Sequence, residues 1–236
     1  YKYELHFESG NNVGGLIKTE CRYRHTMTKI KWRPDINVFT DINIPVEYFH
    51  NILKKQAIVN KGLLLKFKNE VTKGQFEEMD FVYENGIVDY VNEIADGTAM
   101  TETKYIECER RGRDREDKPD YNVKLSVAFC FSNKVNMLEY YHNSSFLEHG
   151  GSPDKAVSNA FVYTIDKYLK ANNKYTKNES KINFNDVKDC LILVSNSLSG
   201  LTSYENQTKK AINNKFIQEA MTEFLRHELE VYFIEN

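Results

Sequence analysis

The sequence predicts an α+β fold, and three observations carry the prediction. Apolar side chains alternate with polar ones at residues 1–8 and 123–131, a pattern typical of β-strands. Apolar side chains recur at helical spacing after Pro45, after Pro153 and along residues 214–233, which predicts amphipathic helices. Expected strands and helices follow one another in an irregular order, so we expect mixed sheets with helices packed on them.

The first part of the chain opens with a strand at residues 1–8, whose apolar side chains share one face that we expect to be half-buried. Gly10 begins a turn. Pro45 suits the first turn of a helix, and Gly62 suits its end. Further strands are expected at residues 16–24, 29–32 and 63–68.

A polar stretch at residues 70–78, with Gly74 in its middle, predicts a domain boundary. We therefore expect one domain at residues 1–75 and a second at residues 76–236. A short helix is expected to begin near Ile87, early in the second domain.

Residues 107–120 form a dense run of both charge signs. Its arginines could contact DNA, but its interspersed acids favour a solvated connection between two strands. Residues 123–131 then predict a long central strand and residues 137–142 another. After the Gly150-Gly151 pair, Ser152 is expected to cap the helix that has Pro153 in its first turn.

The last part holds a short apolar strand at residues 191–194, a loop rich in Ser, Gly and Thr, and the final helix at residues 214–233. The loop carries the polar tip Gln207-Thr208-Lys209. A lysine and an amide held out by a strand and a helix are suited to an anion such as a phosphate. A solvated lysine pair, Lys209 and Lys210, is the alternative interpretation.

Composition narrows the function. The 236 residues are 41% apolar with a net charge of −2, which indicates a folded core and argues against a nucleic-acid binder that uses its whole surface. A basic channel confined to one part of the surface is still compatible with this net charge. The four cysteines form no CxxC pair, which fits reduced thiols and no zinc site. The sequence has no signal peptide and no apolar run of membrane-spanning length.

Several stretches together resemble one family. The 204–210 stretch, with Gln207-Thr208-Lys209, is similar to the Gln-Thr-Lys loop of the B subunits of bacterial type IIA DNA topoisomerases. Thr26-Met27-Thr28, followed by Pro34-Asp35, resembles the family's Thr-Gly-Thr…Pro-Asp pattern. Weaker matches follow in the family's order at residues 60–62, 83–91, 143–151 and 186–191.

The resemblance implies the end of a GHKL-type ATPase sheet at residues 1–75 and a transducer domain at residues 76–236, with a ribosomal-protein-like fold and a left-handed βαβ crossover. It implies that Lys209 stabilises the terminal phosphate of ATP during catalysis, that Gln207 binds it as well, and that Thr28 lies by the adenine. It further implies Mg²⁺ as cofactor, DNA and a topoisomerase A subunit as partners, a homodimer through the ATPase region, and a cytoplasmic location.

The sequence also departs from the family pattern. Met27 stands where the family has glycine, and Glu148 stands where many relatives carry a basic residue that faces DNA. The glutamate base, the magnesium asparagine, the adenine aspartate and the glycine lid of these ATPases are not found. Tyr1 is not a start methionine, so we expect a fragment of a longer protein that does not hydrolyse ATP alone.

Two other interpretations stay open. One is a segment of another GHKL ATPase of the chaperone or mismatch-repair type. The other is a non-enzymatic RNA-binding module, because the transducer fold is shared with a small-subunit ribosomal protein. The Thr-x-Thr and Gln-Thr-Lys pair favours the topoisomerase, but which topoisomerase of the family it is stays open.

Overall fold

The computed structural model describes residues 1–236 as two compact units, Tyr1–Tyr48 and Phe49–Asn236. Helix α1 (Val46–Val59) begins in the first unit and continues into the second, directly after Pro45 as predicted. Proline lacks a backbone N–H, which the first helical turn does not need. None of the helices combines the length and the hydropathy that a membrane span requires.

The first unit contains a single hairpin of β1 (Lys2–Glu8) and β2 (Asn11–Thr19). Its turn is Ser9-Gly10, both with positive φ (49° and 80°), and it pairs Glu8 with Asn11. This turn places β2 earlier than the predicted strand at residues 16–24. The strand expected at residues 29–32 is not formed. The face expected to be buried is exposed, because no other helix or strand forms before α1 to cover it.

The second unit begins with α1 and a hairpin of β3 (Leu65–Thr72) and β4 (Gln75–Phe81). The polar stretch at residues 70–78 forms the turn end of this hairpin, where Thr72 pairs with Gln75 across Gly74. Most of its side chains are polar, and both faces of the hairpin tip are exposed. The division into domains at residues 1–75 and 76–236 stays a prediction.

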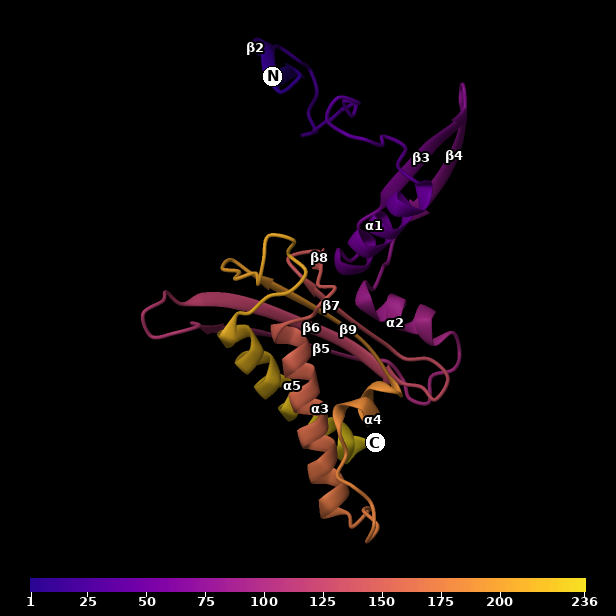
Figure 1. The fold of residues 1–236 in the computed structure, drawn as a ribbon, viewed down its shortest axis with the longest axis vertical. Helices are drawn as coiled ribbons and strands as arrows, with labels where there is room; N and C mark the ends of the chain where they lie inside the picture. The colour runs from indigo at the N-terminus through magenta and orange to yellow at the C-terminus, as the bar shows by residue number, and fades with distance from the viewer. The chain divides into compact units, whose positions relative to one another are not determined.

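A five-stranded mixed sheet forms the centre of the second unit, with the order β5-β6-β9-β7-β8. β9 pairs antiparallel with β6 and parallel with β7, so the segment between β7 and β9 makes a crossover that contains α3 (Figure 1). The hand of this crossover stays a prediction. The bounds are β5 Lys104–Gly112, β6 Tyr121–Phe131, β7 Met137–His142, β8 Ser145–Phe146 and β9 Leu191–Ser199.

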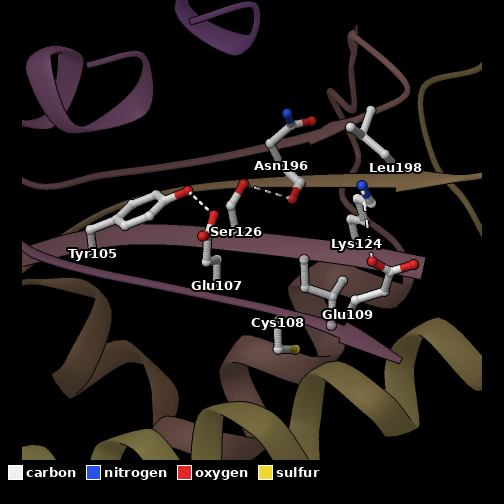
Figure 2. Close-up of a pocket in the computed structure, with 9 residues that line it drawn as sticks. Tyr105, Glu107, Cys108, Glu109, Lys124, Ser126, Asn196 and Leu198 are labelled. Atoms are coloured by element: carbon white, nitrogen blue, oxygen red, sulfur yellow. Dashed lines mark hydrogen bonds and ion pairs between the residues drawn. The ribbon is translucent and has the colours of Figure 1, made fainter. Parts of the chain in front are cut away.

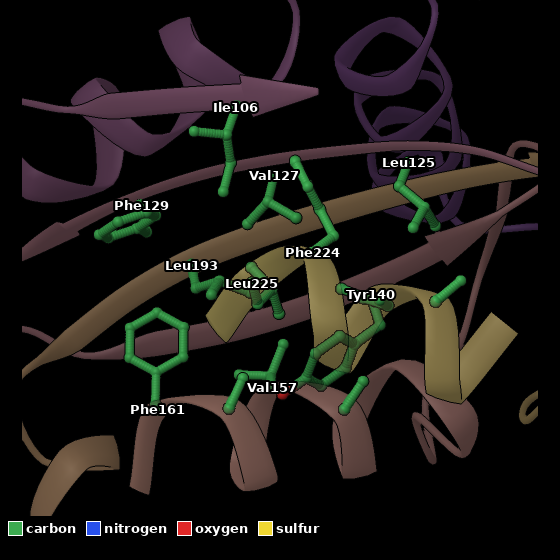
Figure 3. Close-up of a cluster of buried hydrophobic side chains, with 14 of the residues drawn as sticks. Ile106, Leu125, Val127, Phe129, Tyr140, Val157, Phe161, Leu193, Phe224 and Leu225 are labelled. Atoms are coloured by element: carbon green, nitrogen blue, oxygen red, sulfur yellow. The ribbon is translucent and has the colours of Figure 1, made fainter. Parts of the chain in front are cut away.

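Helices cover both faces of this sheet. α3 (Ser152–Ala171) and α5 (Lys215–Glu235) pack on one face, where Val127, Phe129 and Leu193 meet Phe161 and Leu225 (Figure 3). The short α4 (Phe184–Lys188) precedes β9. α2 (Ile87–Ala95) packs on the opposite face. The predicted helices from Pro153 and along residues 214–233 are confirmed, as is the α+β class.

The central strand β6 is buried more fully than its alternation predicts. Val127 and Phe129 face α3 and α5, as expected for one apolar face. Ala128 and Cys130 on the other face are also fully buried, because α2 packs there. A strand buried on both faces reads as a nearly continuous apolar run, and Ala128-Phe129-Cys130-Phe131 is such a run.

Candidate functional site

The loop after β9 returns on itself as a narrow arm. Tyr204 forms an antiparallel bridge with Ile212, the Glu205 N–H donates to the Ala211 carbonyl at 3.0 Å, and the Asn213 N–H donates to the Ser203 carbonyl at 2.9 Å. These bonds pair the two sides of the arm. Residues 206–210 are therefore held out at its tip.

The Gly150-Gly151 turn lets this arm approach the start of α3. Gly151 has φ of 84° and forms a parallel bridge with Ile212. A Cβ on Gly151 would lie 2.2 Å from the Ile212 carbonyl oxygen, so only glycine fits. Ser152 does not cap α3 as predicted. Ser152 is the first residue of the helix. Because the arm lies close to the start of α3, the Ser152 hydroxyl donates to the carbonyls of Ile212 (3.2 Å) and Asn214 (2.9 Å).

The buried Asn214 side chain holds the base of the arm. Its amide nitrogen donates to Asp114 Oδ2 at 2.9 Å and to the Tyr121 hydroxyl at 3.1 Å, and its amide oxygen accepts from the Ser203 N–H at 2.7 Å. Asp114 also accepts from the Phe216 N–H at 2.9 Å, at the start of α5. The charged run at residues 107–120 is mostly exposed, as predicted, but Asp114 within it ties the arm to α5.

The tip is ordered by its own hydrogen bonds. Asn206 Oδ1 accepts from the N–H and from the hydroxyl of Thr208, and the Asn206 carbonyl accepts from the Lys209 N–H at 3.3 Å. Lys209 adopts a left-handed backbone conformation with φ of 58°. The Gln207 and Lys209 side chains are both exposed, and with Tyr204 and Asn206 they line an open hollow of about 470 Å³.

The structure distinguishes the two lysines of the tip. Lys210 Nζ lies 2.5 Å from a carboxylate oxygen of Glu148, and this hydrogen-bonded lysine lowers the pKa of Glu148. The Lys210 carbonyl also accepts from the His149 N–H at 2.9 Å. Lys209 has no ion pair; its ammonium lies 5.6 Å from the centre of the Tyr204 ring. Of the two lysines, Lys209 is therefore the one whose ammonium has no ion-pair partner.

The structure thus brings Gln207 and Lys209 together at one tip. The third predicted residue, Thr28, lies exposed in an irregular segment of the first unit. Sequence reasoning missed Tyr204, Asn206 and Asn214 as parts of the site. Polar and aromatic residues are common in loops, so nothing in the sequence marked these three as parts of the site. Asn214 and Tyr204 contact residues that are not their sequence neighbours, and Asn206 stabilises the turn in which it lies.

A second hollow, of about 400 Å³, lies on the open part of the sheet face formed by β5, β6 and β9 (Figure 2). There the Tyr105 hydroxyl donates to Glu107 at 2.7 Å, and burial together with this bond raises the pKa of Tyr105 to about 12. Lys124 lies 3.9 Å from Glu109. Glu107 thus accepts from a neutral hydroxyl and Lys124 is paired with Glu109, and none of the predicted site residues lines this hollow.

His142 is buried at the base of the arm, between β9 and the start of the loop. Its Nδ1 lies 2.8 Å from Ser197 Oγ, and its Nε2 lies 2.8 Å from Thr202 Oγ1. Because the Ser197 hydroxyl donates to the Tyr141 carbonyl, Nδ1 is the protonated nitrogen of a neutral ring and Nε2 accepts. Burial lowers the pKa of His142 from 6.5 to about 4. His149, by contrast, is exposed.

This burial predicts a pH-dependent stability. The unfolded chain protonates His142 at a higher pH than the folded chain does, so stability is fully present above pH 6.5 and is lost as the pH falls towards 4. The loss reaches at most about 1.4 kcal/mol per pH unit. Urea unfolding of the wild type and of His142→Gln at several pH values in this range measures the free energy of unfolding. This free energy should fall less steeply with falling pH in the variant. If the free energy of unfolding of His142→Gln depends on pH as steeply as that of the wild type, the prediction is wrong.

Comparison with known proteins identifies the family. Residues 86–236 match the family model described as DNA gyrase B. The B subunit of DNA gyrase from Metamycoplasma arthritidis is 26% identical over 238 residues, which cover 100% of this chain and 37% of that protein. The corresponding protein from Spiroplasma citri is 26% identical over 241 residues, covering 100% and 36%. The chain thus spans a little more than a third of the length of these curated relatives.

Solved structures support the same fold. The ATP-binding domain of topoisomerase IV from Francisella tularensis aligns with a TM-score of 0.70 at 20% identity, covering 99% of this chain and 61% of that one. The B-subunit of DNA gyrase from Myxococcus xanthus aligns with a TM-score of 0.71 at 14% identity, covering 99% and 63%. The family model matches well over half of the chain and decides against the chaperone, mismatch-repair and RNA-binding alternatives. The resemblance seen in the sequence is confirmed, and the chain belongs to the DNA gyrase B family.

Proposed function

We propose that this chain is part of the ATP-hydrolysing subunit of a type II DNA topoisomerase and couples ATP binding and hydrolysis to DNA strand passage. Family membership supports this proposal. The complete subunit would bind ATP and Mg²⁺, with the magnesium ligands outside residues 1–236. Its partners would be DNA, a topoisomerase A subunit and a second copy of itself through the ATPase region, and it would act in the cytoplasm.

In this proposal Lys209 contacts the terminal phosphate of ATP and Gln207 donates a hydrogen bond to the same group, while Thr28 lies by the adenine. A fixed cation is most useful where phosphate charge rearranges in the transition state, in a site from which water is partly excluded. The contact exists only while the terminal phosphate is present. Hydrolysis removes it and frees the arm, so the arm senses the nucleotide state.

The observation that carries the proposal is the difference between the two lysines. Lys210 is paired with Glu148, whereas Lys209 is exposed and unpaired. It lies at the end of an arm whose base is bonded to the start of α3 and to Asp114 and Tyr121. Bonds across the base fix where the arm leaves the domain. They leave the ammonium of Lys209 free to meet an anion from outside the domain.

Hydrogen exchange in the complete subunit tests this function. With a non-hydrolysable ATP analogue and Mg²⁺, the backbone amides of residues 206–210 should exchange more slowly than with ADP and Mg²⁺. The analogue alone presents a third phosphate, so the difference reports contact with that phosphate. Equal exchange in the two nucleotide states would contradict the proposed sensor.

A further inference from the structure

Two adjacent residues, Asn143 and Ser144, connect β7 to β8 in a turn that touches two other parts of the unit. Both have left-handed backbone conformations, with φ of 47° and 62°, and His142 pairs with Ser145 across them. This geometry is the favoured one for a two-residue hairpin, but its second position is usually glycine. A non-glycine pair in this conformation persists only where surrounding contacts stabilise it.

On one side the 143–144 turn holds the start of the arm. The Asn143 amide nitrogen donates to the Ser199 carbonyl at 3.0 Å and to the Thr202 hydroxyl at 3.1 Å, and its amide oxygen accepts from the Ser199 N–H at 3.0 Å. The Asn143 N–H donates to the Ser197 carbonyl at 2.9 Å. Regular pairing of β7 with β9 ends at Ser197, so the Asn143 side chain continues it where the arm leaves the sheet.

On the other side the same turn contacts the end of α1. The Gln56 amide nitrogen donates to the Ser144 carbonyl at 2.8 Å, and Ser144 Oγ lies 3.4 Å from Asn60 Oδ1. Next to the turn, the Lys55 ammonium lies 3.3 Å from the centre of the Phe146 ring. α1 and the arm thus share one connecting turn, although Gln56 itself bonds to no residue of the arm.

We propose that Asn143 and Gln56 are positioning residues, and that the 143–144 turn transmits the position of α1 to the arm that carries Lys209. The strained turn conformation persists only while its bonds to the arm and its bonds to α1 are both made. We therefore expect two discrete arrangements of the turn and no gradual deformation. The mechanical part of this inference is that the turn links the position of α1 to that of the arm, and it concerns only residues 49–236. The catalytic part is that this link places Lys209 for ATP turnover, and it rests on the function proposed above.

Hydrogen exchange of this chain tests the mechanical part. Asn143→Gly keeps the turn conformation but removes three side-chain bonds, so amides of residues 199–205 should exchange at least about tenfold faster. Ser144→Gly is the matched control: it keeps the carbonyl that binds Gln56 and should stay within about twofold of the wild type. Gln56→Ala should also speed exchange of the arm, and should add little in the Asn143→Gly background because both act through one turn.

Steady-state kinetics of the complete subunit test the catalytic part. Asn143→Gly and Gln56→Ala should lower kcat for ATP hydrolysis while the KM changes little, because a misplaced Lys209 weakens the transition state more than ATP binding. Lys209→Ala is measured beside them. If Lys209→Ala lowers turnover while both variants match the wild type in turnover and exchange, the inference fails and the proposed function stands. If both variants speed exchange but Lys209→Ala leaves turnover unchanged, the mechanical link stands and the proposed function fails.

Discussion

Lys209→Ala in the complete subunit should lower ATP turnover about a hundredfold, because removing one preorganised cation from a developing charge costs about 3 kcal/mol. The KM for ATP should change much less, since the charge helps most as the terminal phosphate rearranges. Measuring kcat and KM by phosphate release separates the two effects. Because Lys209 is exposed and unpaired, the variant should fold normally, and its melting temperature should match that of the wild type.

The neighbouring lysine provides the matched control. Lys210→Ala removes the ion pair with Glu148, which lies at the surface and contributes little. Turnover should stay within about twofold of the wild type. Equal losses of turnover from the two substitutions, or no loss from Lys209→Ala, would mean that Lys209 and Lys210 are ordinary solvated lysines.

Gly151→Ala should destabilise the second unit by about 3 kcal/mol or more. The added Cβ would lie 2.2 Å from the Ile212 carbonyl oxygen and 2.9 Å from its nitrogen, and φ of 84° is unfavourable for alanine. Neither backbone can yield without breaking the bridge that joins the arm to α3. Urea unfolding followed by circular dichroism should show the loss as a lower midpoint.

Gly200→Ala is the control for this substitution. Gly200 lies in the same loop, but a Cβ there would meet nothing within 4 Å and its φ is not in the positive range. Alanine should leave stability unchanged or raise it slightly, because it restricts the unfolded chain. A wild-type midpoint for Gly151→Ala would show that the close approach between Gly151 and Ile212 does not hold the arm.

Much of the fold could be predicted because local patterns specify it. The alternation at residues 123–131 and the apolar stripe after Pro153 predict β6 and α3 from their own side chains. Predictions failed where the pattern was weak or depended on other elements. The strand expected at residues 29–32 finds no partner, and β2 follows the register of the Ser9-Gly10 turn rather than its apolar residues.

The α+β class, the family resemblance and the placing of Gln207 and Lys209 in one loop could all be predicted from the amino-acid sequence, because they depend on local spacing and residue identity. The folded chain was needed to show which lysine is unpaired, why Gly151 is required, and that Asn143, Asn214 and Asp114 hold the arm. Each of these depends on residues far apart in the chain: Lys210 meets Glu148, Gly151 meets Ile212, and Asn214 meets Asp114. Contacts of this kind arise only when packing brings the segments together, and no local pattern records them.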